Sequence, residues 1–248
     1  MANQNKNNVD LEEIEKFNLL AHKWWDPTSE FKPLHEINPL RLNFIKSSLN
    51  LKGKKVLDVA AGVSSFCAIG NAVGLNITAI DPAYYYMADE IEIKAEEDLD
   101  TLLTKLAFNK AHYNWDFYHD IEGVRISRFK AYQTFLKDYQ SNPSRYIPGE
   151  VSKLPFEDKE FDTTLVSHLM FLYDHLFTEE EQIAIFRELI RVTKNEIIIF
   201  PTKNLSGQNS KWVDLIVKNT EFLEHTFRLE EAQFEFQKGN SLRLRVTV

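Results

Sequence analysis

Short apolar runs separated by polar and small residues divide most of the chain into strands and helices. The segments 55–59, 76–81 and 161–167 each hold a compact apolar run rich in β-branched residues, which predicts strands. The segment 197–200 is apolar throughout, as expected of a short strand covered on both faces. Apolar side chains at helical spacing predict helices over 11–22, 39–49 and 179–193. The buried side of the last helix is expected to carry Ile183, Phe186, Leu189 and Ile190.

The order of these elements predicts an α/β protein with a doubly wound, mostly parallel sheet. Two alternating runs, about 224–236 and 241–248, predict a closing antiparallel hairpin through 238–240. The segment 83–147 is longer than one helix and one strand require, so we expect an inserted helical segment with helices near 87–106 and 126–139. Its aromatic side chains form either a wall that faces a substrate or anchors that hold the insert to the core. They are Tyr84, Tyr85, Tyr86, Tyr113, Trp115, Phe117 and Tyr118.

The composition narrows the class of protein. Among 248 residues there are 37 acidic and 29 basic side chains, and the formal net charge of -8 argues against a surface that coats nucleic acid. The single cysteine, Cys67, excludes an internal disulfide, fits a reducing compartment and is expected to be a small buried residue of the first helix after 55–59. We find no signal peptide, no bilayer-spanning apolar run and no metal-ligand spacing. These features favour a cytoplasmic protein with no nucleic-acid partner and no metal.

The segment from Val56 to Phe66 is the most informative part of the sequence. It predicts a buried strand, a tight turn of small residues and the start of a helix, and a second strand follows that ends in Asp81. In doubly wound folds this order builds a nucleoside pocket at the carboxyl ends of the strands, where an acidic residue can accept the ribose hydroxyl protons. Of a glycine-rich dinucleotide fingerprint only Gly62 is present, and the turn has no lysine, so a loop that cradles phosphates is not expected.

The same turn resembles motif I of class I S-adenosylmethionine-dependent methyltransferases, in which an acidic and a hydrophobic residue precede a Gly-x-Gly-x-Gly run. Asp58 takes the acidic position, and the three glycine positions hold Ala60, Gly62 and Ser64. A second match follows, because Glu150 stands four residues before a Leu-Pro-Phe, where its carboxylate can accept from an adenine amino group. The resemblance implies a seven-stranded Rossmann-like methyltransferase fold and S-adenosyl-L-methionine as the cofactor.

The first part of the chain, from about Asn8 to Val59, resembles bacterial ubiquinone-biosynthesis O-methyltransferases in the segments 15–17, 21–26 and 30–41. This resemblance implies that Arg41 contacts the cofactor carboxylate, a pairing that suits the guanidinium fork. It also implies O-methylation of a polyprenyl catechol or quinone precursor, and so peripheral contact with the inner membrane or a lipid-like substrate. The segments 127–139, 167–173 and 234–240 instead resemble bacterial class I methyltransferases of unassigned substrate.

Together these motifs predict a helical N-terminal cap over 1–50 and a methyltransferase domain over 51–248, with the helical insert at about 83–147. They assign cofactor binding to Arg41, Asp58, Ala60, Gly62, Asp81, Glu150 and Ser167. His168, at the carboxyl end of the strand 161–167, is the candidate catalytic base for a phenolic acceptor, ahead of His35 and His175. A lone histidine beside an apolar strand is more often structural. The alternatives are methylation of an unassigned small molecule and a methyltransferase-like binding protein that has lost catalysis, which the degraded glycine run favours.

Overall fold

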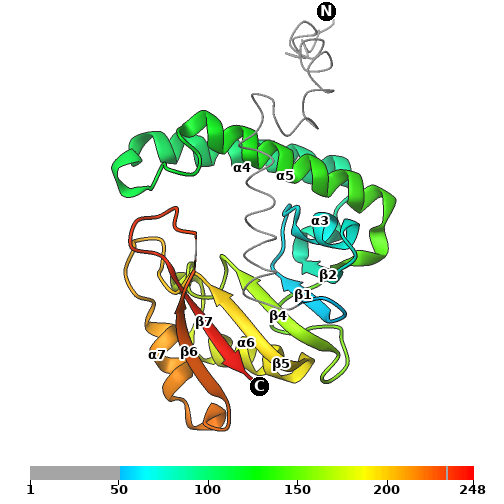
Figure 1. Cartoon of the computed structure of the whole chain (residues 1–248), viewed down its shortest axis with the longest axis vertical. Helices are drawn as coiled ribbons and strands as arrows, with labels where there is room; N and C mark the ends of the chain where they lie inside the picture. Colours follow the sequence, from blue (N-terminus) through cyan, green and yellow to red (C-terminus); the bar gives the residue numbers. More distant parts are fainter. Residues whose placement is uncertain (1–50, 233) are drawn as a thin grey trace, which may run out of the picture. The chain divides into compact units, whose positions relative to one another are not determined.

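The computed structural model describes residues 51–232 and 234–248, and it places seven strands in one mixed sheet with the order β3-β2-β1-β4-β5-β7-β6 (Figure 1). The parallel strands are β1 (Lys55–Val59), β2 (Asn76–Asp81), β3 (Tyr146–Pro148), β4 (Phe161–Ser167) and β5 (Thr193–Phe200). The strand β7 (Leu242–Thr247) is antiparallel to both β5 and β6 (Thr226–Glu231). This arrangement confirms the predicted fold class, a doubly wound, mostly parallel sheet of seven strands with an antiparallel C-terminal hairpin. The helices predicted over 11–22 and 39–49 lie outside the described residues.

Strands β1, β2 and β4 have the predicted bounds, whereas β5 begins at Thr193 and not at residue 197. It follows directly on helix α6 (Glu179–Val192), and Thr193 is already paired with Phe161 of β4. The buried hydroxyl of Thr193 is 2.6 Å from that of Thr164 and donates to the carbonyl of Leu189. These contacts fix the start of the strand although the residues that follow, Lys194 to Glu196, are polar.

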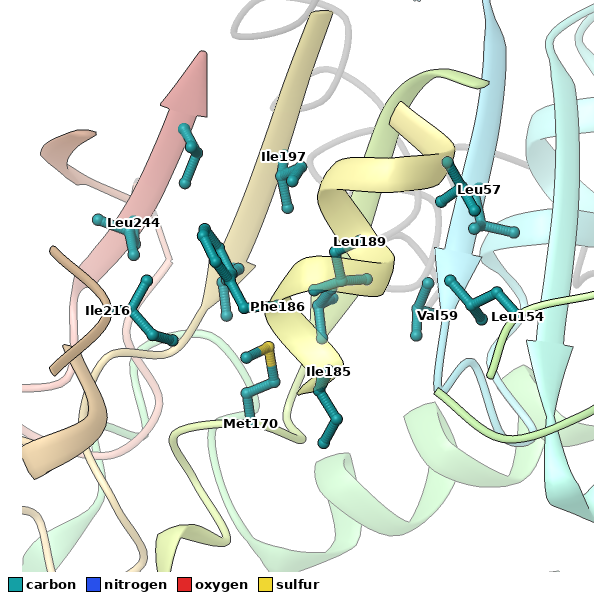
Figure 2. Packing of buried hydrophobic residues seen from close by; sticks show 14 of the residues in the cluster. Leu57, Val59, Leu154, Met170, Ile185, Phe186, Leu189, Ile197, Ile216 and Leu244 are labelled. Carbon is teal, nitrogen blue, oxygen red and sulfur yellow. The ribbon is translucent and has the colours of Figure 1, made fainter. Parts of the chain in front are cut away.

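One face of the sheet carries a continuous apolar row, because side chains in register on neighbouring strands share a face. Val59, Val166, Ile199 and Leu244 follow one another in register across β1, β4, β5 and β7. Helix α6 packs against β5 and buries Ile185, Phe186 and Leu189 in the same cluster, and α7 (Lys211–Lys218) packs against α6 (Figure 2). We call this cluster, defined by the row and the α6 side chains, the sheet core.

Between β2 and β3 the chain forms two long helices, α4 (Ala88–Phe108) and α5 (Ile121–Ser141), which lie side by side (green in Figure 1). The base of this hairpin is held by packed rings of Tyr84, Phe135, Tyr139 and Tyr146, with centroids 5.3–5.7 Å apart. Tyr84 lies in the short helix η2 (Pro82–Tyr85), directly after β2. For Tyr84 the anchoring interpretation therefore holds, whereas Tyr85 and Tyr86 are largely exposed.

The tip of the same hairpin contacts the loop between β6 and β7, about 120 residues further along the chain. The backbone N–H of Asn114 donates to the carbonyl of Phe236 at 2.7 Å, and that of Lys238 donates to His112 at 3.0 Å. A set of half-buried rings packs mostly edge to face around these bonds, and we call it the aromatic bridge: Tyr113, Trp115, Phe117, Tyr118, Phe234 and Phe236. Four aromatic residues of the insert therefore anchor its tip to the C-terminal hairpin.

Helix α3 (Phe66–Ala72) packs against β2 and α5 and carries the only cysteine of the chain. Cys67 is 1% exposed, as predicted, and its thiol donates to the carbonyl of Ile77. Burial, with a smaller contribution from the negative charge of Asp58, raises the pKa of the Cys67 thiol to about 12. The remaining short helices are η3 (Lys110–His112), η4 (Pro143–Arg145), η5 (Asp174–Leu176) and η6 (Thr220–Phe222). None of the helices in the described part combines the length and the apolar character needed to cross a membrane.

Candidate functional site

The turn after β1 requires two residues in the left-handed backbone region. Gly62 has a φ of 51°, which costs a glycine little, but Ala60 has a φ of 53° and carries a Cβ. The turn is tied to β2 by the N–H of Ala61, which donates to the carbonyl of Ile80 at 3.3 Å. Ala60, which stands at the first glycine position of the motif, therefore adopts a left-handed conformation at an energetic cost that glycine would not have.

Asp81 is the last residue of β2, and its side chain connects the turn after β1 with the segment after β2 through hydrogen bonds. One carboxylate oxygen accepts from the N–H of Gly62 at 2.9 Å, and the other accepts from the N–H of Ala83 at 2.8 Å. The side chain is half-buried, and two backbone donors hold it in one orientation. Because a carboxylate has about four acceptor sites, it can still accept hydrogen bonds from a bound molecule.

The residues that follow β3 lie at the same edge of the sheet as Asp81. Gly149 is buried against Ile80, and a Cβ added to it would lie 2.8 Å from the Cδ1 atom of that isoleucine. The close approach brings Glu150, which is exposed, to the same edge as Asp81. A side chain at position 149 would displace the end of Ile80, so packing and not an unusual φ favours glycine there.

Helix α6 fixes the loop that follows Glu150, from Leu154 to Asp158. The guanidinium of Arg191 donates to the carbonyls of Leu154 and Phe156 at 3.0 and 2.8 Å and to the Asp158 carboxylate at 2.8 Å. It also donates to Glu188, which in turn accepts from the Leu154 N–H at 3.1 Å. The hydrogen bonds from Arg191 lower the pKa of the Glu188 carboxyl below its usual range. The Leu-Pro-Phe segment of the motif is thus fixed by an ion pair on a helix.

A pocket of about 370 Å³ opens where these segments meet. This volume lies within the range of about 300–1,000 Å³ that is common for small-molecule sites. Its lining combines apolar side chains, glycine and proline with three carboxylates: Val59, Ala60, Ile80, Asp81, Pro82, Gly149, Glu150, Val151, Ser152, Leu169, Phe177, Glu181 and Ile185. Of the predicted cofactor residues, Ala60, Asp81 and Glu150 lie in this lining.

The other predicted cofactor residues do not line the pocket in the described part of the chain. Gly62 supports Asp81 through its backbone N–H. Asp58 is 5% exposed in β1, on the side of the sheet where its charge acts on Cys67 and Tyr84. Arg41 falls outside the described residues, as do His35 and the predicted cap over 1–50.

Ser167 and His168 stand exposed at the carboxyl end of β4, next to β1 in the sheet. The N–H of His168 donates to the carbonyl of Phe200 at 2.7 Å, and its ring packs edge-on against the Phe200 ring at 5.4 Å. His168 has a φ of 59°, so it shares with Ala60 a conformation that residues with a Cβ rarely adopt. Strained positions of this kind tend to cluster at functional sites, and these two directly follow the adjacent strands β1 and β4.

One wall of the pocket, supplied by α6 and the preceding loop, holds none of the residues predicted from the motifs. Glu181, Leu169 and Phe177 line the pocket from this side. Thr178 and Glu181 form a capping box, in which each side chain bonds to the backbone of the other residue. The Thr-x-x-Glu pattern in the sequence predicts the helix start and could have directed attention to Glu181, although nothing in it indicates a pocket.

The pocket has the chemistry that S-adenosylmethionine requires. Apolar side chains suit the adenine ring, the fixed Asp81 carboxylate suits the ribose hydroxyls, and an acidic lining suits a positive sulfonium. A Cβ at Gly62 would meet no atom within 4 Å, so the turn leaves open space on that side. Within the described ranges, no group of three or more histidine, cysteine or acidic side chains could hold a metal ion.

The chain is similar in sequence and in structure to several known proteins. No family model matches the chain. Over 193 residues it is 39% identical to the uncharacterized protein MJ0045 of Methanocaldococcus jannaschii, covering 77% of this chain and 85% of that protein. Over 74 residues it is 58% identical to the ubiquinone biosynthesis O-methyltransferase of Nitrosospira multiformis, covering 30% of this chain and 31% of that enzyme.

The resemblance to ubiquinone-biosynthesis O-methyltransferases is therefore confirmed, but the chain spans only about a third of the length of those relatives. Among solved structures, the magnesium protoporphyrin IX methyltransferase of Synechocystis PCC 6803 with bound S-adenosylmethionine aligns with a TM-score of 0.46 at 10% identity. That alignment covers 98% of this chain and 99% of the other.

Proposed function

We propose, from the premise that the chain belongs to the same family as protein MJ0045 of Methanocaldococcus jannaschii, that it is an S-adenosylmethionine-dependent methyltransferase acting on a small molecule. The observation that carries the proposal is the pocket at the carboxyl ends of β1 and β2, with Asp81 fixed in its wall. Ligands of doubly wound folds bind at this edge, and a carboxylate ending the second strand is the group that binds a ribose.

Each residue of the site has a distinct part in this proposal. Asp81 accepts from the ribose hydroxyls, and Glu150 accepts from the adenine amino group. Val59, Ile80 and Leu169 exclude water from the pocket. The cofactor supplies a methyl group that is already activated by its sulfonium charge, so the chain has mainly to position and desolvate the acceptor. For a phenolic acceptor, His168 at the end of β4 takes the hydroxyl proton on a ring nitrogen.

The finer proposal concerns the acceptor. The local identity to ubiquinone biosynthesis O-methyltransferases favours O-methylation of a polyprenyl catechol or quinone precursor, which would bring the protein to a membrane surface. The rest of the chain favours a different, unassigned small molecule. The degraded glycine run, in which Ala60 replaces the first glycine, favours a third outcome, a binding protein that has lost catalysis.

Calorimetric titration of the full chain with S-adenosylmethionine and its demethylated product tests the cofactor. We expect binding, and Asp81→Asn should weaken it by about 1.5–3 kcal/mol, because the ribose hydroxyls lose a charged acceptor. Asp89→Asn is the matched control, since Asp89 is an exposed carboxylate in the first turn of α4. Absence of binding by a folded protein at millimolar cofactor would refute the proposal.

A cofactor analogue that lacks one ribose hydroxyl separates a direct contact from damage to the loop. Asp81→Asn also leaves one backbone N–H without its acceptor, so the melting temperature is measured in parallel. The analogue should bind the unaltered protein more weakly than S-adenosylmethionine, but it should lose little further affinity for Asp81→Asn. Equal losses in both proteins would show that Asp81 does not contact the ribose.

The acceptor is tested by incubating the purified protein with S-adenosylmethionine and demethylated quinone analogues and detecting methylated product by mass spectrometry. Methylation of a catechol analogue, together with loss of the product in His168→Ala at unchanged cofactor affinity, supports the finer proposal. Cofactor binding without conversion of any such analogue would favour the unassigned substrate or the binding protein.

A further inference from the structure

Tyr84 is a buried residue outside the motifs, and its hydroxyl reaches the turn after β1. Tyr84 is 5% exposed, and its hydroxyl donates to the carbonyl oxygen of Gly62 at 2.7 Å. The N–H of the same glycine donates to Asp81 at 2.9 Å. Both polar backbone groups of Gly62 are therefore held by residues that end or follow β2.

This arrangement links the phenol to the pocket by a short path. The carbonyl of Gly62 is fixed by Tyr84, its N–H is then aimed at one oxygen of Asp81, and that carboxylate lines the pocket. Gly62 has a φ of 51° and open space around its α-carbon, so few packing contacts restrict the turn. The two hydrogen bonds therefore fix the orientation of Gly62 itself, beside the bond from the N–H of Ala61 to the carbonyl of Ile80 that ties the turn to β2.

The phenol is itself held rigidly by the helical hairpin. The ring of Tyr84 stacks on Phe135 of α5 at 5.7 Å and meets the edge of Tyr146 at 5.4 Å. The hydroxyl of Tyr139, also in α5, donates to the carbonyl of Tyr84 at 3.2 Å. Burial, followed by the charges of Asp58 and Asp81, raises the pKa of Tyr84 well above its usual value, so the hydroxyl remains a donor.

We propose that Tyr84 is a positioning residue of the cofactor site: its hydroxyl sets the Gly62 turn, and through it the Asp81 carboxylate, against the rigid base of the α4–α5 hairpin. The inference rests on the proposed function. It gives the long insert between β2 and β3 a part in cofactor binding although its helices contribute no residue to the pocket lining in the described ranges.

Tyr84→Phe tests this inference because it removes the hydroxyl and keeps the ring. Calorimetry of the full chain should show roughly tenfold weaker binding of S-adenosylmethionine, as expected for the loss of one orienting hydrogen bond. Tyr146→Phe is the matched control, since it removes a hydroxyl of the same ring cluster that donates to Asp138 and not to the turn. This control should bind with nearly unchanged affinity, and the melting temperatures of both variants are measured alongside.

Hydrogen exchange provides a readout that does not depend on the cofactor. The amide of Gly62 should exchange faster in Tyr84→Phe than in Tyr146→Phe, while the amides of β1 and β4 remain protected. Equal exchange in the two variants, or equal cofactor affinity in Tyr84→Phe and the unaltered protein, would overturn the inference alone. Failure of the unaltered protein to bind would instead overturn the proposed function, and the exchange experiment would then decide whether Tyr84 fixes the turn.

A double-mutant cycle distinguishes positioning from general damage. If Tyr84 acts through Asp81, the combination of Tyr84→Phe with Asp81→Asn should bind about as weakly as Asp81→Asn alone. Independent losses, in which the fold-changes of the two single variants multiply, would show that the phenol acts by another route.

Discussion

The sheet core and the aromatic bridge are both clusters of large apolar side chains, but they are buried to different degrees. In the sheet core, Phe186, Leu189 and Val166 are 0% exposed, and strands and a helix surround them. In the bridge, every ring is only half-buried, and two loops supply all of them. The core therefore gains the full free energy of burial, whereas the bridge gains part of it and relies on ring geometry.

The two regions also differ in how their backbones are held. Ladders of hydrogen bonds that extend over four or more residue pairs connect the strands beneath the core. At the bridge, the two backbone bonds donated by Asn114 and Lys238 form a single isolated pairing of Tyr113 with Gln237. We infer that the core opens only when the whole domain unfolds, whereas the bridge can open locally at a lower free energy.

The largest expected effect comes from a cavity in the sheet core. Phe186→Ala removes a fully buried ring that packs on Phe222 at 4.8 Å, and it should lower the free energy of unfolding by about 3–5 kcal/mol. Urea denaturation followed by circular dichroism measures this change. Phe129→Ala is the control, because Phe129 of α5 is 39% exposed and its loss should cost far less.

The bridge should respond to a matched substitution in a different way. Phe236→Ala removes ring contacts with Tyr113, Trp115 and Tyr118 and should cost about 2 kcal/mol, from about 0.5–1.5 kcal/mol for each aromatic pair with incomplete burial. Hydrogen exchange should accelerate at the amides of Asn114 and Lys238 and stay slow in β4. A uniform acceleration across the sheet would show that bridge and core unfold as one unit.

A smaller effect is expected where a loop is held by charge and not by apolar packing. Glu188→Gln weakens the ion pair with Arg191 that holds the Leu154–Asp158 loop, and at neutral pH it should cost about 1 kcal/mol because both partners are partly exposed. The Glu188 pKa is lowered in the folded state. Its contribution is therefore complete above the ordinary carboxyl pKa and is lost as the pH falls through the lowered value.

Denaturation curves of Glu188→Gln and the unaltered protein from pH 7 downward check that sign. The difference in unfolding free energy should shrink as the solution becomes more acidic. A difference that stays constant with pH would mean that Glu188 contributes through its shape and not through its charge.

The smallest expected effect lies at the edge of the pocket. Ala60→Gly relieves a left-handed conformation worth about 1–2 kcal/mol, offset by about 0.5–1 kcal/mol of extra chain entropy, so a net gain of about 0.5–1 kcal/mol is expected. The melting temperature should rise by about 1–4 °C. Ala68→Gly, in the interior of α3, is the control and should instead destabilise by about 1 kcal/mol. A fall in melting temperature for Ala60→Gly would contradict the assignment of strain.

The helices and strands could be predicted from the sequence more closely than the residues that line the pocket. Strands β1, β2 and β4 have the predicted bounds because each is a short apolar run between residues that favour turns. Helix α6 was expected to bury Ile183 and Ile190, but these are half-buried, and Gln182, Ile185 and Val192 are buried instead. Periodicity located the helix, but the rotation of its buried stripe depends on the sheet beneath it.

At the site, the motif residues that sequence reasoning could find are those next to the turns. Ala60, Asp81 and Glu150 line the pocket because the ends of parallel strands meet at one edge. Phe177 and Leu169 could not be found in this way, since their positions depend on how distant segments pack, and Tyr84 could be identified only as one of several aromatic residues of the insert. No local pattern indicates that a phenol after β2 contacts the turn after β1.

The reactivity of Cys67 can report when the structure around helix α3 opens. Because it is the only cysteine, is 1% exposed and has a thiol pKa raised to about 12, its thiolate is scarce and inaccessible in the closed molecule. An alkylating reagent at neutral pH can therefore modify the protein once per chain, and only while α3 is displaced from β2. The rate at which the mass of the protein increases then reports how often α3 separates from β2, and no other thiol contributes to the signal.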